Sequence, residues 1–221
     1  ILSAYPNSRL EEVAEHNIFS PVGKASGTIG GELVLKESSV YPIATYQEIK
    51  RDTMQALLNA LASLEKEDGA GVQILIRPAG SGWTKTASAE SSNLRQGKKS
   101  RKGGELAFWW IRQIFTAPVK PPEAKEGAQS VEQPHVSGTD QARAEAVEEK
   151  ARHNGYEVLI RVVASSNISH RSQVILNNIV AVFSLYEATG RNGFKFIPAK
   201  DVDSFVLAYI LRFFPPEYRK S

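Results

Sequence analysis

The residue types best suited to binding chemistry gather in one stretch of the chain, between positions 85 and 115. Six basic side chains against one acid, Glu90, give residues 85–102 a net charge of +5, whereas the whole chain carries only +3. Such a basic run can contact the phosphates of nucleic acid or an anionic lipid surface. Its basic residues are Lys85, Arg95, Lys98, Lys99, Arg101 and Lys102.

An apolar, aromatic piece follows at 106–115 and holds two of the three tryptophans. A short helix of this kind beside a basic run can lie at the headgroup level of a membrane. The same pattern also suits a segment that packs on this protein or on a neighbour. Membrane surface, nucleic acid and packing therefore stay open as interpretations. The candidate membrane or partner contacts are Phe108, Trp109, Trp110, Ile111, Ile114 and Phe115.

Signatures of catalysis and of cofactor binding are missing from the sequence. A phosphate loop requires Gly-x4-Gly-Lys-Ser/Thr, and the glycines around Gly80 and Gly82 do not have that spacing. The four histidines are scattered without a second ligand at helical spacing, and there is no cysteine. We therefore expect no catalytic residue, no cofactor, no metal and no small-molecule substrate.

The elements that would position these residues follow from periodicity and turn chemistry. We expect strands at 9–13, 32–36 (on a hairpin), 72–77, 156–163 and 194–197. We expect helices at 52–66, from about 139 to 152, from about 169 to 190 and at 201–213. The last helix has its apolar stripe at Val202, Phe205, Val206, Tyr209, Ile210 and Phe213.

The pattern of Gly71–Arg77 echoes that of Gly155–Arg161, and each copy follows a helix. It predicts an α+β fold: a mixed or antiparallel sheet with helices packed on one face. Two interpretations of the echo stay open: two related helix–strand halves, or two unrelated buried strands that each follow a helix. The halves would be 1–79 and 139–221, separated at 80–138 by a basic and aromatic insertion and a Pro-rich linker. Arg77 and Arg161 end equivalent strands, and each is expected to pair with a carboxylate or to cap a helix end rather than to share an anion site.

Several of these segments together resemble a domain of bacterial proteins. They are Tyr5–Val13, the leucine helix leading into Val72–Pro78, the basic run with its Pro-rich linker, the helix leading into Gly155–Arg161, and Gly193–Pro198. The domain precedes the FtsK/HerA-class motor ATPase in type IV secretion or conjugative DNA-transfer family proteins. The resemblance places membrane helices before Ile1 and the ATP site after Ser221, which agrees with a chain that lacks an initiator methionine. It carries over no functional residue.

The resemblance implies a non-catalytic accessory domain, not an enzyme, at the inner, cytoplasmic face of a bacterial membrane. Its partners would be further copies of itself or other secretion-machine subunits, with a membrane surface or DNA as additional contacts. The alternative is a nucleic-acid-binding module that uses the basic run at 85–102.

Overall fold

The computed structural model describes residues 6, 18–19, 27–49, 51–97 and 137–216. The strands of this part are β1 (Thr28–Leu35), β2 (Gly69–Pro78), β3 (Tyr156–Ser165) and β4 (Phe194–Pro198). The helices are α1 (Thr53–Leu61), α2 (Gly82–Arg95), α4 (Gly138–Ala151), α5 (Ser169–Val182), the 3₁₀ helix η2 (Phe183–Tyr186) and α6 (Val202–Ile210).

The four strands form one sheet in the order β2-β3-β1-β4, and every neighbouring pair is antiparallel. The predicted α+β class with an antiparallel sheet is therefore confirmed. The strand predicted at 32–36 is present as part of β1, but the prediction that it belongs to a hairpin is wrong. β1 pairs with β3 and β4, which come much later in the chain. β1 and β2 from the first predicted half interleave with β3 and β4 from the second, so both halves share one sheet.

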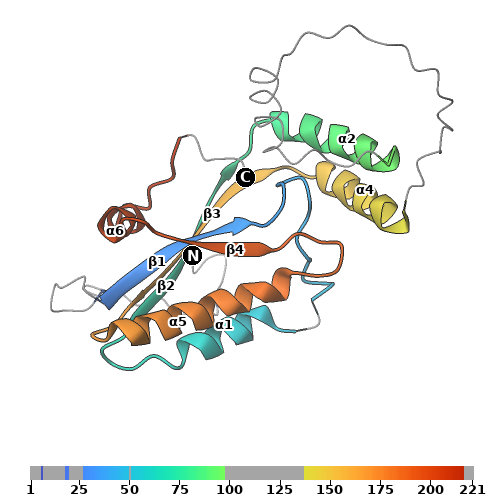
Figure 1. Cartoon of the computed structure of the whole chain (residues 1–221). Helices are drawn as coiled ribbons and strands as arrows, with labels where there is room; N and C mark the ends of the chain where they lie inside the picture. Colours follow the sequence, from blue (N-terminus) through green and yellow to red (C-terminus); the bar gives the residue numbers. More distant parts are fainter. Residues whose placement is uncertain (1–5, 7–17, 20–26, 50, 98–136, 217–221) are drawn as a thin grey trace, which may run out of the picture.

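One face of the sheet carries the main hydrophobic core. Because side chains alternate along a strand, Leu33, Ile160 and Val162 all point to the same side, where they pack with Ile175 and Ile179 of α5. α1 packs beside α5 under the same face (Figure 1). These two helices lie where the sequence predicted helices to lie.

α6, in contrast, packs on the opposite face of the sheet, so the prediction that the helices pack on one face is wrong. The ring of Phe205 lies against Gly30, and the hydroxyl of Tyr209 lies against Gly71, so close that a Cβ at either glycine would clash. Gln73 and Arg161 on this face donate hydrogen bonds to the carbonyls of the last turn of α6. Glycine at these two positions thus lets the helix approach the strands closely.

Several predicted boundaries need correction. The helix expected at 52–66 ends at Leu61, although Asp52 is its N-cap, accepting a hydrogen bond from the backbone N–H of Gln55 at 3.0 Å. The helix expected to reach 190 ends at Val182 and continues only as η2. The strand expected at 9–13 lies outside the described residues.

A second, smaller core joins α2 and α4, which lie side by side beyond the end of the sheet (Figure 1). Its buried side chains are Val40, Tyr41, Ala87, Leu94, Ala144 and Val147. Val40 and Tyr41 belong to the loop after β1, so this loop connects the helix pair to the sheet. α2 was not predicted, because residues 82–95 were read as part of a basic insertion.

Asn192 holds the loop after β1 in place through hydrogen bonds, and its side chain is almost completely buried. Its Oδ1 accepts hydrogen bonds from the backbone N–H groups of Glu37 and Gly193, both at 2.9 Å. Its Nδ2 donates to the carbonyls of Glu37 at 3.2 Å, Ser38 at 3.1 Å and Tyr41 at 3.4 Å. One side chain therefore satisfies backbone groups that the irregular loop would otherwise leave without partners.

Candidate functional site

Only part of the predicted binding stretch lies in the described residues. Lys85 and Arg95 lie on α2, where both are exposed. The remaining predicted contacts lie outside the described residues: Lys98, Lys99, Arg101, Lys102, Phe108, Trp109, Trp110, Ile111, Ile114 and Phe115. The predicted nucleic-acid or lipid surface can thus be judged at two of its six basic positions.

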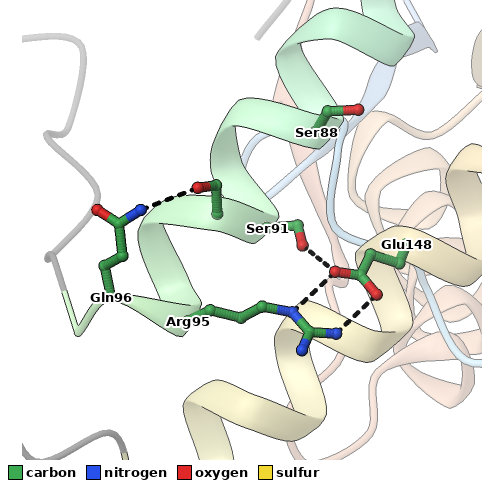
Figure 2. Close-up of a pocket in the computed structure, with 6 residues that line it drawn as sticks. Ser88, Ser91, Arg95, Gln96 and Glu148 are labelled. Atoms are coloured by element: carbon green, nitrogen blue, oxygen red, sulfur yellow. Dashed lines mark hydrogen bonds and ion pairs between the residues drawn. The ribbon is translucent and has the colours of Figure 1, made fainter.

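Arg95 is held in an ion pair that crosses from α2 to α4. Its Nε lies 2.9 Å and its terminal nitrogen 2.8 Å from the two carboxylate oxygens of Glu148, a bidentate geometry (Figure 2). The hydroxyl of Ser91 donates to the same carboxylate at 2.5 Å. The hydrogen bond from Arg95, followed by that from Ser91, holds the pKa of Glu148 below its usual value. A phosphate would therefore compete with Glu148 for Arg95.

The same residues line an open pocket of about 380 Å³ formed by α2 and α4, and Figure 2 shows its lining side chains. Its other lining residues are Ser88, Ser92 and Gln96. The carboxylate of Glu148 neutralises the guanidinium of Arg95, and the other polar groups of the lining are serine hydroxyls and the amide of Gln96. The Ser91 hydroxyl lies beside the Glu148 carboxylate, but the hydrogen bond from Arg95 lowers the pKa of that carboxylate and so makes it a weak base. Because the guanidinium and the carboxylate are paired, the lining also offers no concentrated charge for an anion.

Arg77 and Arg161 do not form a shared anion site. Arg77 pairs with Glu157 at 2.7 Å and donates to the carbonyls of Pro215 and Pro216 at 2.9 and 3.0 Å. Its guanidinium also lies over the ring of Phe214, 4.1 Å from the ring centre. Arg77 thus ties the segment after α6 to the end of β2.

Arg161 is buried between the sheet and α6. It lies 3.5 Å from the carboxylate of Glu32 and donates to Gln73 and to the carbonyl of Ala208, each at 3.2 Å. Both arginines therefore pair with carboxylates and stabilise the ends of other segments, as the sequence predicted.

Two further properties concern metals and membranes. Within the described residues, no group of three or more histidine, aspartate or glutamate side chains is arranged to hold a metal ion. No helix in the described ranges is both long and apolar enough to cross a bilayer.

The outer surface of α6 is an exposed apolar surface. Leu207, Ile210 and Leu211 are spaced i, i+3 and i+4, so they lie along one side of the helix, and they are 58%, 57% and 66% exposed. We call these three residues the α6 stripe. The predicted stripe of this helix is thus partly wrong, since Ile210 and Phe213 are exposed while Phe205 is buried.

Another exposed apolar surface lies on β2 and β3. Ile76 is paired with Val158, Pro78 with Tyr156, and Ile74 with the buried Ile160. Four side chains of these strands point to the same face as the main core and are nevertheless exposed. They are Ile74 (53% exposed), Ile76 (62%), Tyr156 (60%) and Val158 (40%). We call these four residues the β2–β3 face.

Sequence reasoning missed both surfaces. A signal for the first was present, because α6 is apolar at almost every position, and such a helix has more apolar surface than one sheet face can cover. The β2–β3 face had no local signal, since its strands read like any buried strand.

The chain was compared with protein families, with curated proteins and with solved structures. Residues 1–213 match the family model described as a domain of unknown function, DUF8128. The chain belongs to this family. No curated protein matches the chain, and neither does any solved structure. The DUF8128 description assigns no activity, so functional inference rests on the surfaces described above.

Proposed function

We propose that this DUF8128 domain is a non-catalytic assembly domain that self-associates through α6. It would act as an accessory domain of a membrane-anchored, type IV secretion or conjugation-like DNA-transfer ATPase, at the cytoplasmic face of the bacterial membrane. Self-association would hold neighbouring motor subunits together. The observation that carries the proposal is the exposed α6 stripe.

The stripe has the exposure expected of an interface. Three large aliphatic side chains, each more than half exposed, stand on a helix whose other side is already packed against the sheet. Covering them would remove apolar surface from water, which is the main driving force for association. A helix packing on the stripe could bury all three at once, because they occupy adjacent turns.

Charge supports a second copy as the occupant of the stripe. Asp203 lies in the first turn of α6, and Arg212 follows Leu211, the C-cap of the helix. A twofold axis through the middle of the helix, between Leu207 and Ala208, would place two α6 helices antiparallel. Asp203 of one copy would then lie opposite Arg212 of the other, twice in each dimer. The stripe would lie between these two charge pairs.

The alternative of nucleic-acid binding has less support in the described residues. Two basic residues of the predicted nucleic-acid surface are described. Arg95 is paired with Glu148, so only Lys85 of these two remains as an exposed contact for a phosphate. It stays a prediction for the run at 85–102 and is tested by neutralising Lys98, Lys99, Arg101 and Lys102 and measuring DNA binding against salt.

The test is the oligomeric state of the full chain, measured by sedimentation velocity over a range of concentrations. We expect a dimer, and we expect Leu207→Lys to weaken it at least about tenfold, since a central apolar anchor is replaced by a charge. Leu58→Lys is the matched control, because Leu58 is also an exposed helical leucine, 53% exposed, on α1. The control should dimerise like the unmodified chain.

The twofold arrangement has its own test. Asp203→Arg and Arg212→Asp should each weaken the dimer, and the two changes together should restore it. A chain that stays monomeric at high concentration, or a Leu207→Lys variant that associates as well as the control, would refute self-association through α6.

A further inference from the structure

The β2–β3 face is a continuation of the main core that α1 and α5 do not cover. Along β3, Ile160 and Val162 are buried under these helices, whereas Val158 and Tyr156 on the same side are exposed. Along β2 the partly buried Val72 packs on the core, and exposure begins at Ile74. Figure 1 shows the two strands running past the α1–α5 layer toward α2 and α4.

The face is apolar across two strands. Its four members are isoleucine, valine and tyrosine, and cross-strand pairing brings Ile76 directly beside Val158. Scattered exposed aliphatic residues are ordinary, but a contiguous group on one sheet face marks a place where something docks. The occupant must therefore offer apolar or aromatic side chains.

We propose that residues 106–115 of the same chain occupy the β2–β3 face. This segment reads Leu-Ala-Phe-Trp-Trp-Ile-Arg-Gln-Ile-Phe, with a single charged residue, Arg112. Its aromatic rings offer large apolar areas at low entropic cost per side chain. The proposal assigns the aromatic segment a role as part of the core rather than as a membrane or DNA contact.

The lengths of the connecting segments permit this docking. β2 leads through residues 79–81 into α2, so the face lies close to the first turn of α2. The 14 residues of α2 span about 21 Å. The nine steps from Gly97 to Leu106 reach up to about 30 Å when extended, so the chain can return along the whole helix. On the other side, residues 116–136 connect the segment to Ser137, the N-cap of α4.

The connection to α2 and α4 also favours this occupant over a separate molecule. A segment tied at both ends is present near the face at an effective concentration in the millimolar range. It also avoids most of the loss of translational and rotational freedom that a second copy would incur. Docking within one chain therefore requires less contact area than docking between chains.

Tryptophan fluorescence of the full chain tests the proposal. The chain has three tryptophans, and Trp83→Phe leaves Trp109 and Trp110 as the reporters. In this background we expect blue-shifted emission and weak quenching by acrylamide. Adding Ile76→Lys should weaken docking at least about tenfold, because it buries a charge against apolar side chains. Emission should then shift to the red and quenching should rise.

Ile197→Lys is the matched control. Ile197 is a strand isoleucine, 47% exposed, on the opposite face of the sheet, and its substitution should leave both readings unchanged. Tyr156→Ala is a second variant that introduces no charge and should shift emission in the same direction as Ile76→Lys. Circular dichroism shows whether each variant keeps its fold.

Three outcomes would overturn the proposal. The first is equal emission and quenching in Ile76→Lys and Ile197→Lys. The second is protection of the tryptophans that disappears on dilution, which would mean that a second copy covers them. The third is a blue shift that occurs only with vesicles containing phosphatidylglycerol, which would assign the segment to an anionic lipid surface.

Discussion

Asn192→Ala is the substitution whose effect can be worked out most fully from the structure. The amide of Asn192 is the common partner of the backbone at Glu37, Ser38, Tyr41 and Gly193. Alanine would leave the N–H groups of Glu37 and Gly193 without their acceptor, and the carbonyls of Glu37 and Tyr41 without this donor. The carbonyl of Ser38 would still accept from the backbone N–H of Tyr41 at 3.1 Å. The loop that they hold carries Tyr41 into the second core.

The size of the effect follows from the two N–H groups. A buried donor left without a partner costs about 1–3 kcal/mol, which applies to the N–H of Gly193, whereas the half-buried N–H of Glu37 costs only about 1 kcal/mol. Together they predict a loss of about 2–4 kcal/mol in the free energy of unfolding. For a chain of this length, that loss corresponds to a fall of about 5–15 °C in the melting temperature. The two carbonyls add little, because an acceptor tolerates imperfect pairing better than a donor does.

Urea unfolding and hydrogen exchange would measure both consequences. We expect the stated loss of stability. Amides of α2 and α4 should lose more protection from hydrogen exchange than amides of α5, because the loop packs on α2 and α4. Asn178→Ala on the exposed side of α5 is the control and should change little. A loss below about 1 kcal/mol, or unchanged protection in α2 and α4, would refute the idea that one amide holds the loop.

Two further substitutions test other contacts. Gly155→Ala should destabilise the chain by about 1–3 kcal/mol, because a Cβ there would clash with the indole of Trp83, whereas Gly80→Ala, which meets no atom within 4 Å, should be neutral in thermal melts. The second concerns the carboxyl of Asp68, only 1% exposed, whose pKa is lowered from 3.8, chiefly by the hydrogen bond from Arg171. Its contribution to stability is complete above pH 3.8 and is lost as the pH falls through the lowered pKa. Asp68→Asn should therefore be less stable at neutral pH and lose less stability on acidification, and equal acid slopes for both chains would contradict this.

Local patterns predicted most elements because they depend on neighbours in sequence. The stripe of α5 and the cap of α1 at Asp52 are of this kind, and both are present. α2 was missed because its inward positions include the small residues Ala87 and Ser91, which give a weak apolar period. A helix that packs closely on another helix often has such small residues, so a stripe weak in large residues need not mean a loop.

The sites were harder to predict than the elements. Arg95 was predicted as a contact to nucleic acid or anionic lipid, and its pairing with Glu148 was not foreseen, because that pairing depends on α2 lying beside α4. The pairing of Arg77 and Arg161 with carboxylates was predicted correctly, because buried or half-buried charges need partners. Which carboxylates serve them depends on the strand register.

The sequence by itself determined the α+β class, most of the strands and helices, and the separation of charge into a basic run and a slightly acidic remainder. Tertiary structure alone decided the strand order β2-β3-β1-β4 and placed α6 on the face opposite α1 and α5. It also decided which apolar surfaces remain uncovered, the α6 stripe and the β2–β3 face. The physical reason is that burial is a property of pairs of elements. A strand or helix carries its apolar residues wherever it lies, but only the elements packed against it decide which of them meet water.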